Sequence, residues 1–102
     1  MPNDHAVMVH LRGHGLPDDV YEQYDLATIE DQLIEIIEQK GLGAFDGNEM
    51  GPKETILFMY GADAERLYSS IESALRNYPL CQGAKVVLRY GPPGSEQREI
   101  LL

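Results

Sequence analysis

Three histidines near the N-terminus are the side chains best suited to metal binding or proton transfer. His5, His10 and His14 fall within ten residues, and histidine is the commonest metal ligand and titrates near neutral pH. If residues 5–12 form a strand, His5 and His10 point to opposite faces, because side chains alternate along a strand. Their spacing also fits no established ligand pattern. We therefore predict incidental, solvated histidines, with no metal site and no cofactor.

The segment Arg12-Gly13-His14-Gly15 is the second candidate for chemistry. It directly follows the first predicted strand. A glycine-bearing loop between a strand and a helix can turn backbone N–H groups toward an anion. Arg12, Gly13, His14 and Gly15 are therefore predicted to bind a ligand, either a small anion or an amino acid.

No set of residues predicts a catalytic centre. The sequence contains no nucleophile–base pair, phosphate-binding loop or dinucleotide motif. Cys81 is the single cysteine, which excludes an intrachain disulfide and a thiolate zinc site. The sequence thus favours a non-enzymatic protein, and we assign no catalytic residue.

Two helices and four or five strands would position these groups. Alternation of Val7, Val9 and Leu11 predicts a strand over 5–12, followed by a loop to about Tyr24. Asp25 and Gly41 are suited to cap the two ends of a helix between them, and Asp63 is suited to start a second helix over 63–77. Further strands are predicted over 42–48, 54–60 and 84–90, with a short one over 98–102.

This order of elements predicts a single domain over residues 1–102. It is the order of an α+β, ferredoxin-like βαββαβ sandwich, in which two helices cover one face of an antiparallel sheet. The expected strand order is 4-1-3-2, with a short fifth C-terminal strand beside strand 4. A simpler α+β meander is the alternative topology.

Two families resemble this arrangement. The acylphosphatases are similar in fold class, in chain length and in an arginine in the first loop, here Arg12, but their first-strand motif G-x-V-Q-G-V-x-F-R is absent. The ACT-type regulatory domains are similar in element order and bind small amino acids near the first loop. That resemblance implies an alternative function, a small-ligand-binding regulatory domain that uses the first βα loop.

A sheet covered on one face leaves the other bare. Residues 54–60 are apolar on both faces. If Leu57 and Met59 face the helices, Ile56, Phe58 and Tyr60 lie on the open side of the sheet. The reverse register would expose Leu57 and Met59 instead. Contiguous exposed apolar surface usually marks an interface. We predict an interface formed by Ile56, Phe58, Tyr60, Met8 and Val87, which would support a homo-oligomer or bind a protein partner. The alternative is that loops or termini cover this face.

Charge limits the range of partners. The chain carries 17 acidic and 8 basic residues, a net charge of −9, which argues against nucleic acid. The longest apolar run is 56–60, far short of a membrane span, and Met1–His5 lack signal-peptide character; we expect a cytoplasmic protein. Acidic residues over 18–38 suit a basic partner, although solubility explains them equally well. The leading hypothesis is a small acidic protein-interaction module; an immunity-type inhibitor that masks a basic partner is an alternative.

Overall fold

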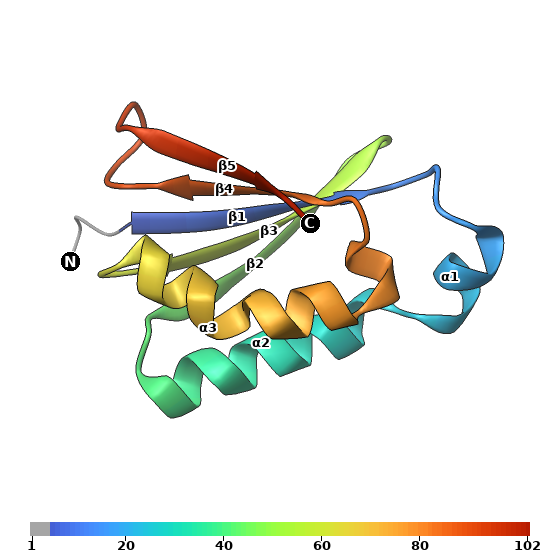
Figure 1. Cartoon of the computed structure of the whole chain (residues 1–102), viewed down its shortest axis with the longest axis horizontal. Helices are drawn as coiled ribbons and strands as arrows, with labels where there is room; N and C mark the ends of the chain where they lie inside the picture. Colours follow the sequence, from blue (N-terminus) through green and yellow to red (C-terminus); the bar gives the residue numbers. More distant parts are fainter. Residues whose placement is uncertain (1–4) are drawn as a thin grey trace.

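A computed structural model describes residues 5–102, which form a five-stranded antiparallel sheet with helices packed against one face (Figure 1). The strands are β1 (His5–Arg12), β2 (Ala44–Met50), β3 (Glu54–Gly61), β4 (Lys85–Arg89) and β5 (Gln97–Leu101). The helices are α1 (Asp18–Gln23), α2 (Leu26–Lys40) and α3 (Ala64–Asn77), and a short 3-10 helix, η1, spans Pro79–Cys81.

The strands lie in the order β2-β3-β1-β4-β5, which reads β5-β4-β1-β3-β2 from the opposite edge. Every neighbouring pair is antiparallel. β1 is central: Met8 pairs with Phe58 of β3 on one side and with Val87 of β4 on the other. The short C-terminal strand lies beside β4.

The two long helices begin at the predicted capping residues. The Asp25 carboxylate accepts a hydrogen bond from the Thr28 backbone N–H at 3.0 Å, and Asp63 accepts one from Arg66 N–H at 3.2 Å. These bonds satisfy amides that have no partner within the helix. α2 ends at Gly41, whose φ of 62° lies in the left-handed region that glycine adopts without strain.

Two sequence expectations were wrong in detail. The predicted loop before Tyr24 contains α1, because Pro17 precedes it with a fixed φ and Asp18 and Asp19 suit the positive end of a helix. The second strand begins at Ala44 rather than residue 42. Leu42 instead belongs to the end of α2, where its N–H donates to the Ile37 carbonyl at 3.0 Å.

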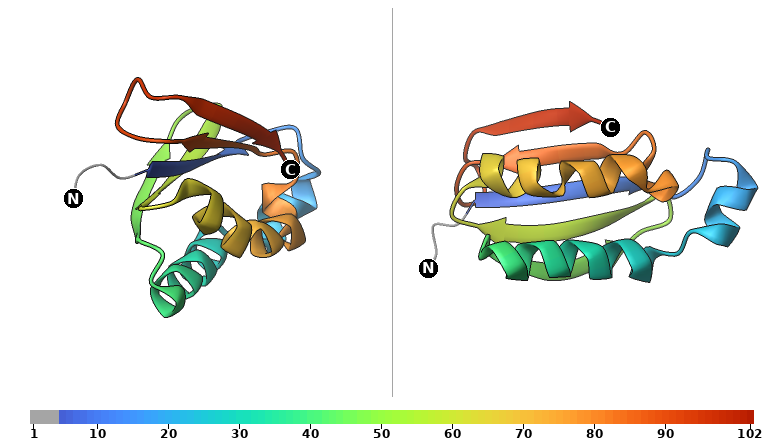
Figure 2. Two further views of the ribbon diagram at one scale, coloured as in Figure 1. Left: turned by 60° about the vertical axis from the view of Figure 1, so that its left-hand side comes forward. Right: turned by 60° about the horizontal axis from the view of Figure 1, so that its bottom comes forward.

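The two long helices form a layer against one face of the sheet (Figure 2), and the core side chains come from both layers. Leu57 and Met59 of β3 are fully buried there, so Ile56, Phe58 and Tyr60 point to the opposite, open face. The side chains that meet them from the helices are also fully buried: Ile29, Leu33 and Ile37 of α2, and Leu67, Ile71 and Leu75 of α3. All the helices of residues 5–102 lie off the open face.

Candidate functional site

The open face of the sheet brings together all five residues predicted as an interface. Residues paired across antiparallel strands share a face, so the register defines three rows across the sheet. The middle row is Gly47, Phe58, Met8, Val87 and Glu99. Ile56 lies in the row on one side and Tyr60 in the row on the other.

These five side chains form one apolar strip, which we name the β1 strip after its central strand. Met8, Ile56, Phe58 and Tyr60 are half-buried, whereas Val87 is only 5% exposed because Met8 and Glu99 flank it on the neighbouring strands. Tyr60 lies between Ala44 and Ala6, and Phe58 lies beside Gly47. Small neighbours leave the aromatic faces accessible from solvent.

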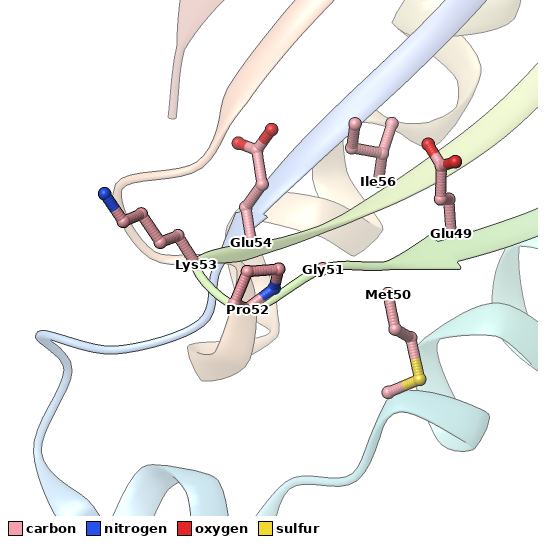
Figure 3. Close-up of a pocket in the computed structure, with 7 residues that line it drawn as sticks. All are labelled: Glu49, Met50, Gly51, Pro52, Lys53, Glu54 and Ile56. Atoms are coloured by element: carbon pink, nitrogen blue, oxygen red, sulfur yellow. The ribbon is translucent and has the colours of Figure 1, made fainter.

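Two acidic side chains of the open face lie on the side of β2 and β3, and a third, Glu99, lies on β5. Glu49 and Ile56 are register partners, and Glu54 precedes Ile56 by two residues on the same face. Figure 3 shows Glu49, Glu54 and Ile56 projecting from one side of the hairpin and Met50 from the other. This hairpin borders an open hollow of about 530 Å³, so both carboxylates stand at the rim of the β1 strip.

Two basic side chains lie on the other side of β1, on β4. Lys85 pairs with His10, and Arg89 pairs with Ala6, so both leave β4 on the open face, where the Arg89 Nε–H donates to the Gly91 carbonyl at 2.8 Å. With Arg12 and Glu99 included, the register assigns three basic and three acidic side chains to this face: Arg12, Lys85 and Arg89, and Glu49, Glu54 and Glu99. These six charges cancel, and Asp46, at the bulge of β2, is an exposed charge that the register assigns to neither face.

The predicted ligand loop is only partly arranged as expected. The Gly13 N–H donates to the Lys53 carbonyl at 3.0 Å, so it extends the sheet and does not point toward a ligand. The Arg12 guanidinium lies between Gly15 and Gly83. A Cβ atom added to Gly15 would come within 2.6 Å of one terminal nitrogen of Arg12, and one added to Gly83 would come within 3.0 Å of the other. His14 is exposed, and Gly15 therefore serves to seat the arginine.

The Tyr21 side chain connects two parts of this loop by hydrogen bonds. Its hydroxyl donates to the Arg12 carbonyl at 3.2 Å and accepts from the Leu16 N–H at 3.3 Å. Beneath the loop is a hollow of about 360 Å³ with mainly apolar walls; its lining includes Arg12, Gly13, Tyr21, Tyr24, Met50 and Leu80. Of the four residues predicted to bind a ligand, the hollow includes Arg12 and Gly13 but neither His14 nor Gly15.

The three histidines are separated in space. His5 Nδ1 accepts a hydrogen bond from the Ala64 N–H at 3.0 Å, at the start of α3. His10 Nδ1 lies 3.3 Å from a Glu54 carboxylate oxygen on the open face, and His14 is in the loop. Within residues 5–102, no group of three His, Cys, Asp or Glu side chains is placed to hold a metal ion.

Cys81 is not placed as a nucleophile. It is 1% exposed and belongs to the core, and burial raises the pKa of its thiol to about 12. The thiolate, which is the reactive form, is therefore suppressed at neutral pH.

Lys85, Arg89, Glu49 and Glu54 were not among the predicted site residues. Alternation in residues 84–90 already indicated that Lys85, Val87 and Arg89 share a face. The acidic pair could not be assigned in the same way, because its position depends on the register between β2 and β3 and on the bulge between Phe45 and Gly47.

The wider comparisons give no further information on the site. No family model matches the chain, and no curated protein or solved structure is significantly similar to it. In the described residues, no helix combines the length and apolar character needed to cross a membrane.

Proposed function

We propose that this protein is a non-enzymatic interaction module that pairs with a second copy of itself through the open sheet face. The observation that carries the proposal is the β1 strip, an apolar surface whose register-paired charged neighbours cancel, on a chain whose net charge is −9. Long-range repulsion between two such chains opposes association. The balanced charges around the strip limit that repulsion where the two copies would touch.

The size of the face fits a weak, reversible dimer. Five strands about 4.8 Å apart, each rising about 3.3 Å per residue, give a face of roughly 24 by 20 Å. Two copies would cover about 1,000 Å² in projection, at the lower limit for a specific interface. We therefore expect a dimer that dissociates on dilution.

The fold class belongs to the same proposal. We assign the sandwich to the ferredoxin-like class, with β5 added beside β4. Support comes from the adjacency of β4, β1, β3 and β2 and from the placement of α2 and α3 on one face. Such sheets have one face free for contacts.

The test places a charge in the middle of the β1 strip. Phe58→Glu should convert a concentration-dependent dimer into a monomer, because two carboxylates would be buried against apolar surface. Sedimentation velocity across micromolar concentrations measures this. Met50→Glu is the matched control, since Met50 is 71% exposed on the other side of the sheet. A wild-type monomer at high concentration, or a dimer that survives Phe58→Glu, contradicts the proposal.

A small-ligand regulatory domain is the second candidate. The hollow of about 360 Å³ beneath the Arg12–Gly15 loop favours it, because that volume and its mainly apolar walls suit a small molecule. Thermal-shift screening with amino acids and small anions tests this function, and Arg12→Ala should abolish any stabilisation. The immunity-type inhibitor stays a prediction based on the acidic residues over 18–38.

A further inference from the structure

We infer that the two copies pack with their twofold axis parallel to β1, so that the acidic side of each open face lies over the basic side of the other. This inference rests on the proposed self-association and adds its orientation. β1 is the middle strand of five. An axis along β1 lays β4 over the partner's β3 and β5 over the partner's β2, whereas an axis across the strands lays each strand over its own copy.

The register identifies which side chains would meet when the axis follows β1. Val87 and Phe58 both pair with Met8. Val87 would therefore lie over the partner's Phe58, Phe58 would lie over the partner's Val87, and the two Met8 side chains would meet at the axis. Lys85 and Ile56 both pair with His10. Lys85 would therefore lie over the partner's Ile56, close to Glu49 and Glu54.

The third row adds a favourable contact of another kind. Arg89 and Tyr60 both pair with Ala6, so Arg89 would lie over the partner's Tyr60, and a guanidinium over a tyrosine ring is attracted to its face. Glu99 would lie over the partner's Gly47, which is uncharged but adjoins Asp46 at the bulge of β2, so this position contributes no attraction. Aligned sheets cross at about 30°, so this overlay holds best near Met8.

The alternative axis brings like charges together. A twofold axis across the strands through the Met8 row exchanges the two outer rows, and Lys85 would then face Arg89 of the partner, twice in each dimer. Like charges placed opposite one another at an interface disfavour association. The positions of the charges thus select one of two arrangements that the apolar strip alone would permit equally.

The experiment reverses charge on one side of the strip at a time. Lys85→Glu/Arg89→Glu and Glu49→Lys/Glu54→Lys should each raise the dimer dissociation constant by about tenfold or more. An equimolar mixture of the two variants should form a heterodimer close to wild-type affinity, detectable by native mass spectrometry. Lys40→Glu/Arg66→Glu is the matched control, because it changes net charge equally at exposed positions off the face.

A neutral variant separates this inference from the proposed function. Lys85→Ala/Arg89→Ala should weaken the dimer if the axis follows β1, and should tighten it if the axis crosses the strands. Tightening, with Phe58→Glu still disrupting the dimer, overturns the inferred axis and leaves the proposed function intact. A wild-type chain that stays monomeric contradicts both. Circular dichroism confirms that each variant folds.

Discussion

The two faces of the sheet are built from alternate residues of the same strands, yet they differ in what surrounds them. Along β3, Leu57 and Met59 are fully buried beneath the helices, while Ile56 and Phe58 are half-buried on the open face. No polar or charged residue among 5–102 is buried. The buried part of the covered face is accordingly apolar, whereas the open face has charged residues beside its apolar strip.

This contrast shows why a strand that is apolar on both sides need not be enclosed on both sides. One set of side chains stabilises the fold, because it is removed from water within the chain. The other set is half-buried and gains less from folding alone. The proposed dimer would remove its remaining exposed surface from water.

The largest expected difference is in stability within β3. Leu57→Ala should lower the free energy of unfolding by about 3 kcal/mol, since it leaves a cavity in the core. Ile56→Ala, one residue earlier and half-buried, should cost less than about 1 kcal/mol. Urea unfolding at low protein concentration, where the chain is monomeric, measures both. Equal losses would mean that the open face is also enclosed within the chain.

Cys81 tests the covered side by pH. Burial raises its pKa from 9.0 to about 12, so between these values the unfolded chain releases the thiol proton first. Stability therefore falls as pH rises through this window, and it is unaffected well below pH 9, where the thiol is protonated in both states. At pH 10.5 the loss attributable to this thiol should be about 2 kcal/mol.

The control for that loss is Cys81→Ala. Its packing defect is independent of pH, whereas tyrosines and lysines titrate in both proteins, so the difference between the two pH profiles isolates the thiol. Parallel profiles would show that water reaches Cys81 in the folded state.

How far the sequence predicts this arrangement depends on the range of the interactions involved. The ends of α2 and α3 were predictable because Asp25, Gly41 and Asp63 act on amides and carbonyls a few residues away. α1 was missed because it is six residues long and has no buried side chain, so no apolar periodicity marks it. Its local signals, Pro17 and the acidic first turn, were present.

The candidate site was less predictable, because it depends on contacts between distant segments. Which side of β3 is open follows from the alignment of Val7 and Val9 with Met59 and Leu57, which lie 48 or more residues further along the chain. The Gly13 N–H could not be assigned to the Lys53 carbonyl from local sequence. The charge separation across β1 likewise emerges only once the strand order is known.

A smaller effect is expected at the cap of α2, which covers the sheet. Hydrogen bonds from Thr28, first from its side chain and then from its backbone, lower the pKa of the Asp25 carboxyl below 3.8. A lowered folded-state pKa stabilises the fold above the unfolded value and is lost as pH falls through the folded value. Asp25→Ala should lower the melting temperature by a few degrees at pH 7.

That difference from wild type should shrink as the pH is lowered below about 3.8, where the carboxyl is protonated in the unfolded chain. Asp31→Ala removes the same charge from the exposed face of α2 and should cause less change at pH 7. If both variants melt alike, the hydrogen bond at the helix end contributes nothing beyond its charge.

The smallest effect is expected at β5, where the two faces should differ least. Arg98, whose cross-strand partner Leu88 is fully buried, has an ion pair with Glu65 of α3 at 3.2 Å, but both side chains are about half exposed, at 53% and 51%. Exposed pairs of this kind are screened by solvent and salt. Arg98→Ala should therefore lower the free energy of unfolding by less than about 0.5 kcal/mol, and 1 M NaCl should remove the difference from wild type.

Glu99→Ala, on the open face of the same strand, should leave monomer stability unchanged, and urea unfolding compares the two variants. If Arg98→Ala instead lowers the free energy of unfolding by more than about 1.5 kcal/mol, α3 stabilises β5 as strongly as it stabilises the central strands. The contrast between the two faces would then extend to the edge of the sheet.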